Sequence, residues 1–299
     1  MTSGPAARPQ EAAAIDLVAL DIDGTVLTPD HGITPSTGSA VAEARARGVR
    51  LVLASSRGPV ALKGVQAGLN LGDEWFIAYQ GALVARWVGE ELDVLASTAL
   101  AVDIADAIED RAVATGLSVG RYVGCRWRVP RMTAAIEREA SITGHRPTLS
   151  AEGGQGDSAP QKVLVIADGD RDLDALDALA ASLPGAVTAT YSHRNYLEIT
   201  AAGVDKAHGL GPLLAHLSIP LDRTAAVGDG LNDLALFGAV AHPIAMGQAP
   251  DEVKAAAIWV TSSNTEEGVA RALAHLGLAC HSPDPHLTAR PVHGRPTTG

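Results

Sequence analysis

The chain has 299 residues, enough for one large domain or two of ordinary size, and 46% of them are hydrophobic, so it can bury a substantial core. Its 23 lysines and arginines against 34 aspartates and glutamates give a net charge of −11, which argues against nucleic acid and against an anionic membrane as partners. Its two cysteines cannot build a disulfide framework and its apolar runs are too short to span a bilayer, so we expect a cytoplasmic protein, either a monomer or a homodimer.

The first part of the chain alternates apolar runs with a helical pattern, after residues 1–14, which we expect to form a flexible leader. The run "IDLVALD" is typical of a buried strand. The stretch "TPSTGSAVAEARARG" is typical of a helix, with a serine or threonine as N-cap and a glycine to end it. We predict strands at 15–21, 49–55 and 74–80 and a helix at 34–48.

The middle of the chain has a different pattern. Residues 82–97 predict a β-hairpin, the arginine-rich run "RYVGCRWRV" predicts one or two strands, and residues 162–200 predict strand, helix and strands again. We interpret residues 83–195 as a separate α+β module of ordinary domain size. It interrupts a first domain made of residues 15–82 and 196–278.

The last part returns to the alternation of strands and helices. It predicts strands at 223–229, 242–246 and 257–261 and helices at 231–239, 249–257 and 265–277. Strands that alternate with helices predict a parallel sheet covered on both faces, and therefore an α/β fold. Residues 279–299 hold four prolines and little apolar material, so we expect a disordered tail there.

Two carboxylates, Asp21 and Asp23, stand at the end of the first predicted strand, where open parallel sheets bind ligands. At about 5 Å they would repel each other by roughly 3 kcal/mol at an effective dielectric near 20. A shared proton or a divalent cation would offset that repulsion. The alternative interpretation is a capping aspartate and a turn aspartate before a glycine.

A second strand end repeats the design in "AVGDGLNDLALF". It carries Asp229, Asn232 and Asp233, so the two strand ends together hold four carboxylates. Such a set predicts a hard metal ion with oxygen ligands, and Mg²⁺ fits because it takes one or two carboxylates and the rest from phosphate and water. A turn rich in glycine, asparagine and aspartate remains the alternative.

Two further stretches supply groups that bind phosphate. "VLASSRG" places Ser55, Ser56 and Arg57 just past a strand, where hydroxyls and backbone N–H groups can hold phosphate oxygens. "GVDKAHGL" places Lys206 at the start of a helix, although cations favour helix C-termini. A neighbouring anion would explain that position, and a solvated lysine is the alternative.

These stretches, in this order, closely resemble the four motifs of the haloacid dehalogenase-like (HAD) superfamily of aspartyl-phosphate phosphatases. "DIDGTVL" resembles the first motif, "LASSR" the second, "GVDKAHGL" the third and "VGDGLNDLALF" the fourth. The similarity continues through "IAMGQAPDEVKAAAIWVTSSNTEEGVARAL", as in the Cof-type branch, subclass IIB, and covers about residues 15–278. The resemblance implies a Rossmann-like doubly wound core with a mobile α/β cap inserted between the second and third motifs.

The resemblance also implies roles for the motif residues. Asp21 would be the nucleophile, Asp23 the general acid and base, and Ser55 and Lys206 the groups that hold the phosphoryl group. Asn232 would position phosphate or ligand carboxylates. Mg²⁺ would be bound by Asp21, the backbone carbonyl of Asp23 and Asp229, with Asp233 as a further ligand or a supporting residue.

Two positions depart from the family pattern. Ser56 stands where the second motif usually has glycine, and Gln80 stands where the branch often has asparagine, before Gly81-Ala82. Outside the motifs, two groups of residues are considered for binding a second anionic group of the substrate: Arg121, Arg126 and Arg128, and His193, Arg194 and Asn195. A solvated strand face is the preferred interpretation of both groups.

The resulting prediction is a Mg²⁺-dependent phosphatase of small phosphate monoesters such as sugar phosphates, with a small phosphorylated metabolite as its partner. A phosphomutase that uses the same aspartyl chemistry is one alternative, although such enzymes in this superfamily mostly carry a helical cap after the first motif. A non-catalytic metabolite-binding protein is the other, and the presence of both a nucleophile and a proton shuttle argues against it.

Overall fold

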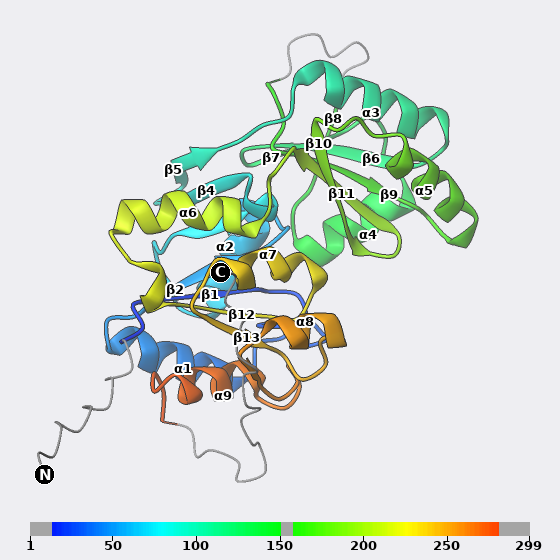
Figure 1. The fold of residues 1–299 in the computed structure, drawn as a ribbon. Helices are drawn as coiled ribbons and strands as arrows, with labels where there is room; N and C mark the ends of the chain where they lie inside the picture. Colours follow the sequence, from blue (N-terminus) through cyan, green and yellow to red (C-terminus); the bar gives the residue numbers. More distant parts are fainter. Residues whose placement is uncertain (1–13, 151–157, 281–299) are drawn as a thin grey trace, which may run out of the picture.

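The computed structural model of the chain describes residues 14–150 and 158–280. The predicted leader, apart from residue 14, and the predicted tail, apart from residues 279 and 280, lie outside the described residues. Figure 1 shows two β-sheets, each with its own helices, joined through the neighbourhood of strand β5 and helix α6. Within the described residues, no helix combines the length and the apolar composition needed to cross a membrane.

The larger sheet has eight strands among the described residues, in the order β14-β13-β12-β1-β2-β3-β4-β5. From β14 to β3 neighbouring strands are parallel, and β4 and β5 continue the sheet as an antiparallel hairpin. The strand bounds are β1 Leu17–Leu20, β2 Arg50–Ala54, β3 Phe76–Ala78, β4 Leu83–Val88, β5 Glu91–Ser97, β12 Thr224–Gly228, β13 His242–Ala245 and β14 Trp259–Val260.

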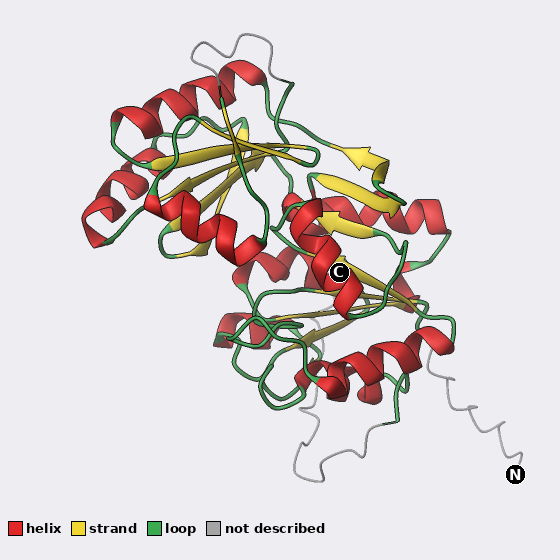
Figure 2. Cartoon of the chain, turned by 180° about the vertical axis from the view of Figure 1, so that it is seen from behind, coloured by secondary structure: helices red, strands yellow, loops and turns green. Residues whose placement is uncertain are grey.

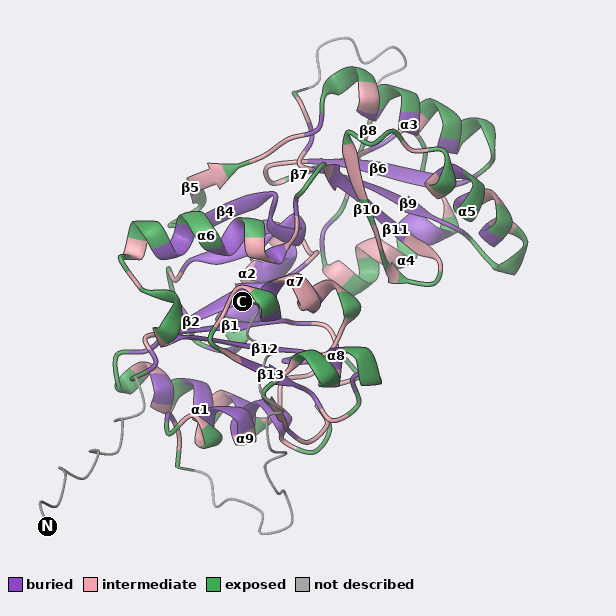
Figure 3. Ribbon diagram, in the orientation of Figure 1, coloured by how far each residue is buried: buried purple, intermediate pink, exposed green. Residues whose placement is uncertain are grey.

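Helices cover both faces of this sheet (Figures 1 and 2). One face packs against α1, α2 and α9, and the other against α6, α7 and α8. Their bounds are α1 Pro35–Ala46, α2 Pro59–Gly68, α6 Lys206–Leu217, α7 Leu234–Gly238, α8 Asp251–Ala256 and α9 Gly268–His275. Because the central strands are covered on both sides, they are buried along their whole length (Figure 3). The predicted doubly wound α/β core is therefore confirmed.

Local interactions explain why two elements begin or end at residues other than the predicted ones. The helix predicted at 34–48 begins after Thr34, whose hydroxyl caps it by accepting from the Thr37 N–H. The strand predicted at 74–80 ends early, because Tyr79 and Gln80 take left-handed φ values of 52° and 58° and form the 3₁₀ turn η1, Tyr79–Gly81. That turn lies at the edge of the site described below.

The smaller sheet has six strands among the described residues, in the order β10-β11-β9-β6-β7-β8. Helices α3 and α5 cover one of its faces, and α4 packs on the other. The bounds are β6 Ser118–Val123, β7 Arg126–Val129, β8 Thr148–Leu149, β9 Lys162–Ile166, β10 Val187–His193, β11 Tyr196–Ala201, α3 Val102–Ala114, α4 Ala134–Thr143 and α5 Leu173–Ala181.

The sheets correct the predicted limits of the inserted module. Strands β4 and β5, expected in the module, belong to the larger sheet, because β4 pairs antiparallel with the otherwise open edge of β3. Strand β11, expected in the first domain from residue 196, belongs to the smaller sheet through its pairing with β9. We therefore propose that the chain passes between the two domains near residues 98–100 and 202–205.

A buried lysine of the smaller sheet, paired with a glutamate of the same sheet, contacts the larger domain. The Lys162 ammonium donates to Glu198 at 2.6 Å, and both side chains are at most 5% exposed. The same ammonium donates to the Ser56 carbonyl at 2.9 Å, in the loop that follows β2. The Tyr79 hydroxyl, which donates to the Gly124 carbonyl at 2.7 Å, adds a second contact. The module thus rests on the loop that carries Ser55, Ser56 and Arg57.

Replacing Lys162 with methionine is expected to lower the free energy of unfolding by about 3 kcal/mol, because Glu198 would remain buried without its cation. Chemical denaturation measures this loss. The matched control is Lys63→Met, which removes an ion pair with the exposed Glu90 and should cost less than about 1 kcal/mol. Equal losses in the two variants would contradict the structural role given to Lys162.

Candidate active site

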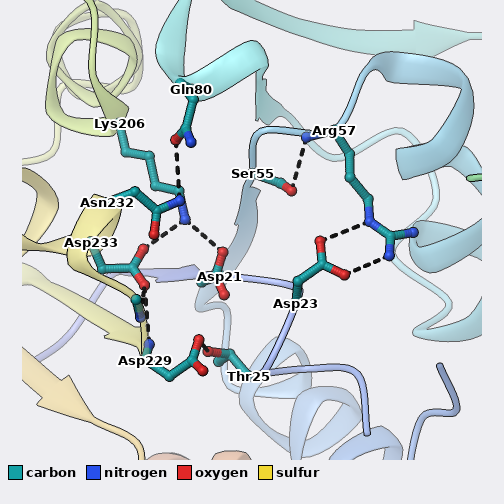
Figure 4. Close-up of polar contacts among 11 residues, drawn as sticks. Asp21, Asp23, Thr25, Ser55, Arg57, Gln80, Lys206, Asp229, Asn232 and Asp233 are labelled. Atoms are coloured by element: carbon teal, nitrogen blue, oxygen red, sulfur yellow. Dashed lines mark hydrogen bonds and ion pairs between the residues drawn. The ribbon is translucent and has the colours of Figure 1, made fainter. Parts of the chain in front are cut away.

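Asp21 and Asp23 follow β1 directly, at the carboxyl end of the parallel strands. The Asp21 N–H donates to the Val227 carbonyl at 2.9 Å, which holds it beside the end of β12. Asp21 is only 5% exposed, whereas the Asp23 side chain is 38% exposed. The two carboxylates therefore sit in different environments: Asp21 is bonded to Lys206 and Asp23 to Arg57 (Figure 4).

Lys206 lies at the first position of α6 and is completely buried. Its ammonium donates to Asp21 at 2.5 Å and to Asp233 at 2.6 Å. Burial alone would lower the pKa of this lysine, but the two carboxylates outweigh burial and raise the pKa above its usual value. The sequence predicts an anion beside this lysine, because a cation is unfavourable at a helix N-terminus. In the structure, Asp21 and Asp233 are the anions beside it.

The N-cap residue and a glycine packed against the first turn fix the start of α6 beside Asp21. Asp205 is the N-cap and accepts from the His208 N–H at 2.8 Å. Gly81, at φ 103°, lies against the same turn, and a Cβ on it would come within 1.9 Å of the Asp205 carbonyl oxygen. A side chain at Gly81 would therefore push the helix start, and Lys206 with it, away from Asp21.

Asp21, Asp229 and Asp233 form a trio of carboxylates with oxygens within 4.8 Å of one another. Asp233 is fixed by the backbone, since one of its oxygens accepts from the N–H groups of Asp229 and Gly230, each at 3.0 Å. Burial, together with the charge of Asp233, raises the pKa of Asp229 to about 6. Burial raises the pKa of Asp21 well above its usual value, against the opposing effect of Lys206.

The trio fits a divalent cation. Its three carboxylates face a single ammonium, so the site is short of positive charge, and hard cations prefer such oxygen donors. The backbone also leaves room only for glycine beside it, because a Cβ on Gly24 would lie 2.1 Å from an Asp229 oxygen. The oxygen donors of the trio are therefore a set that could hold a hard divalent cation.

The three residues of the loop after β2, Ser55, Ser56 and Arg57, have different exposures and different partners. Ser55 is buried, and its hydroxyl oxygen accepts from the Arg57 N–H at 3.1 Å. Ser56 is half-buried, and its carbonyl accepts from Lys162. The Arg57 guanidinium, predicted to bind phosphate, makes two hydrogen bonds to Asp23, at 2.8 and 2.5 Å. Arg57 therefore orients Asp23 in this structure.

Asn232 reaches the site from the 3₁₀ turn η4, Leu231–Asp233. Its side-chain amide donates to the side-chain oxygen Oε1 of Gln80 at 3.3 Å. Two residues of the site were not predicted: the Thr25 hydroxyl donates to Asp229 at 3.3 Å, and the Gln248 amide donates to the Gly24 carbonyl at 2.5 Å. Thr25 follows the aspartates in "DIDGT" and could have been singled out, whereas Gln248 stands in an exposed loop with no such signal.

The arginines considered for substrate recognition point elsewhere. Arg121 is buried on the face covered by α3 and forms ion pairs with Asp106 and Glu109 of that helix. Arg128 lies directly opposite Arg121 in the strand pair, so it projects from the same face. Arg126, two residues before Arg128 on the same strand, shares this face, which is the reverse of the one carrying Lys162.

The second candidate group also lies away from the site. Asn195 is in the β10–β11 turn, where its backbone and side chain bond to Ala167, just past the far end of β9 from Lys162. His193 and Arg194 are exposed beside it. His193 and Arg194 agree with the preferred interpretation, a solvated position, whereas Arg121 does not, because it is buried in ion pairs with α3.

An open α/β sheet whose strand ends gather three carboxylates and a buried lysine defines an enzyme with a candidate divalent-cation site. The chain belongs to the haloacid dehalogenase-like hydrolase family, whose model matches residues 18–273. The predicted superfamily is thereby confirmed, and with it the predicted enzyme class, a phosphoric monoester hydrolase.

Individual relatives cover most of the chain. A protein of Streptococcus pyogenes serotype M6 named "Putative phosphatase" is 30% identical over 282 residues, which are 87% of this chain and 97% of that protein. The 5-amino-6-(5-phospho-D-ribitylamino)uracil phosphatase of Bacillus subtilis is 26% identical over 89% of this chain and 97% of its own. A solved subclass IIB sugar phosphatase shares the fold, with a TM-score of 0.76, 24% identity and coverage of 88% and 99%.

Proposed function

We propose that this chain is a Mg²⁺-dependent phosphatase that hydrolyses small phosphate monoesters through an aspartyl-phosphate intermediate. The observation that carries the proposal is the buried Lys206, which joins the candidate nucleophile Asp21 to Asp233 at the ends of neighbouring strands. A buried cation placed between two carboxylates holds one of them in a fixed orientation. It also leaves that carboxylate close to the groups that would bind a phosphoryl group.

In the first half-reaction, a carboxylate oxygen of Asp21 attacks phosphorus, and the bond to the leaving oxygen breaks. Asp23 gives that oxygen its proton. In the second half-reaction, Asp23 takes a proton from water, which attacks the phosphorus of the aspartyl-phosphate and frees Asp21. The exposed position of Asp23 suits this exchange, and substrate phosphate would compete with Asp23 for Arg57.

A divalent cation would be held by Asp21, the backbone carbonyl of Asp23 and Asp229, with Asp233 supporting the site through its backbone hydrogen bonds. When bound, Mg²⁺ would screen the repulsion between the Asp21 carboxylate and the anionic phosphoryl group. The charge shortage of the carboxylate trio supports this part of the proposal.

The remaining motif residues hold the phosphoryl group. The Ser55 hydroxyl and the Lys206 ammonium both retain a donor for a phosphoryl oxygen, since the ammonium has three N–H groups and uses two on Asp21 and Asp233. Asn232 would position the same group from the end of β12, at the same edge of the sheet, and Ser56 would contribute through its backbone.

The substrate is proposed as a small phosphorylated metabolite, such as a sugar phosphate. The name of the Bacillus subtilis relative, a phosphatase of a phosphoribityl compound, supports a polyol phosphate. A cap domain that rests on the phosphate-binding loop would exclude water and contact the leaving group.

Phosphate release from a panel of sugar and polyol phosphates and from p-nitrophenyl phosphate tests this function. We expect turnover with Mg²⁺, loss of turnover with a chelator, and recovery when Mg²⁺ is restored in excess. Turnover that is unaffected by the chelator would contradict the metal dependence. Interconversion of phosphate positions on a sugar without phosphate release would favour the phosphomutase instead.

A further inference from the structure

The Gln80 side chain has a donor that the fold does not use. Gln80 is only 4% exposed, and its amide nitrogen Nε2 has no hydrogen-bond acceptor among the described residues. Its carbonyl oxygen does have a partner, the Asn232 amide at 3.3 Å. A buried amide N–H without a partner is costly, so an orphaned donor at this depth calls for a ligand.

The backbone holds this side chain in place at a cost. Gln80 and the preceding Tyr79 both take left-handed φ values, 58° and 52°, which residues with a Cβ rarely adopt. Two hydrogen bonds enforce the conformation, from the Gln80 N–H to the Ser55 carbonyl at 3.0 Å and from the Tyr79 N–H to the Arg57 carbonyl at 3.1 Å. Strain that the surroundings enforce is typical of functional sites.

The unused donor faces the groups that would bind phosphate. Figure 4 shows the Gln80 oxygen bonded to the Asn232 amide and the Gln80 nitrogen beside it, on the side of the site where Ser55 lies. Ser55 and Lys206 each keep one donor free for a phosphoryl oxygen, as described above. The Gln80 Nε2 would complete a set of three donors from three different segments, β2–α2, η1 and α6.

We propose that Gln80 is a substrate-binding residue whose Nε2 donates a hydrogen bond to an oxygen of the transferring phosphoryl group. This inference rests on the proposed function, since it assigns a further ligand contact to the same site. A donor aimed at the phosphoryl group stabilises the charge that its oxygens carry in the transition state. In the alternative, Gln80 acts only by orienting Asn232.

The test uses Gln80→Met, which removes the donor and keeps the volume, and orthovanadate as a probe that mimics the transferring phosphoryl group. We expect orthovanadate affinity, measured by calorimetry in the presence of Mg²⁺, to fall about 10- to 100-fold, the range for one hydrogen bond to a charged group. The kcat/KM for p-nitrophenyl phosphate should fall by a similar factor. The matched control is Gln66→Met, at another buried glutamine with an unpartnered amide atom, outside the site.

The Gln66 variant should lose stability but keep orthovanadate affinity within about twofold of wild type. A double variant then combines Gln80→Met with Asn232→Ala and is compared with the two single variants, because the effects of independent contacts on affinity add. If Gln80 binds the phosphoryl group directly, Gln80→Met still weakens orthovanadate in the Asn232→Ala background. If its effect vanishes there, Gln80 acts through Asn232 and the inference is overturned.

Unchanged orthovanadate affinity in Gln80→Met also overturns the inference. The calorimetric result is independent of turnover, so it separates this inference from the function on which it rests. If the wild-type protein binds orthovanadate but hydrolyses no phosphate monoester, the proposed function is contradicted. The orthovanadate affinities of wild type and Gln80→Met still test the inference about Gln80. A wild-type protein that does not bind orthovanadate contradicts both.

Discussion

Replacing Asp21 with asparagine is expected to abolish hydrolysis of phosphate monoesters, with a fall in kcat of at least about 10³-fold. The amide has nearly the same shape as the carboxylate but cannot act as the nucleophile. The fold should persist, because the variant removes one of three mutually repelling carboxylates and Lys206 keeps its ion pair with Asp233. Steady-state phosphate release and thermal unfolding together measure the two effects.

The control for this variant is Asp222→Asn, the same change at an exposed aspartate in η3, Leu221–Arg223. It should keep kcat within about twofold of wild type. If Asp21→Asn retained activity near that of wild type, the nucleophile would have to be another residue, and the assignment of the first motif would be wrong.

Replacing Asp23 with asparagine is expected to lower kcat by about 10²- to 10⁴-fold for substrates whose leaving group is an alkoxide, because such oxygens need a proton as they depart. The loss in the first step should be much smaller for p-nitrophenyl phosphate, whose leaving group departs without protonation. Comparing kcat/KM for an alkyl phosphate and for p-nitrophenyl phosphate in the same variant measures the difference, because kcat/KM reports the first step and not the shared hydrolysis of the aspartyl-phosphate.

The Asp23 variant also breaks the ion pair with Arg57, so its control should break a similar pair elsewhere. Asp93→Asn does this, since Asp93 accepts from Arg86 at 2.8 Å on the β4–β5 hairpin. That change should leave the kinetics of both substrates unaltered. Equal losses in kcat/KM on the two substrates in Asp23→Asn would argue that Asp23 maintains the site rather than protonating the leaving group.

The parallel core and the strand-end carboxylates were predictable from sequence because both follow from local rules. Apolar runs that alternate with helical patterns specify a covered parallel sheet, and parallel strands bring Asp21 and Asp229 to one edge. Lys206 was also detectable, since a cation at a helix N-terminus is unfavourable without an anion nearby. The structure supplies that anion twice, as Asp21 and Asp233.

The errors concern choices that depend on tertiary structure. A hairpin pattern does not state which sheet it extends, so strands β4 and β5 were assigned to the inserted module although they close the edge of the larger sheet. The contact between Arg57 and Asp23 was not foreseen, because the two residues are 34 positions apart in sequence. For Arg121 the signal was present, since Asp106 and Glu109 lie three residues apart on one helical face.

The formation of phosphate on Asp21 is the central claim, and a transient measurement on Asp23→Asn tests it most directly. With p-nitrophenyl phosphate, this variant should form the aspartyl-phosphate rapidly and hydrolyse it slowly, because only the second step needs the base. We predict a burst of p-nitrophenolate equal to the enzyme concentration, with phosphate on the peptide that contains Asp21 after acid quenching. Steady turnover from the first cycle, with no burst and no phosphate on that peptide, would contradict the account.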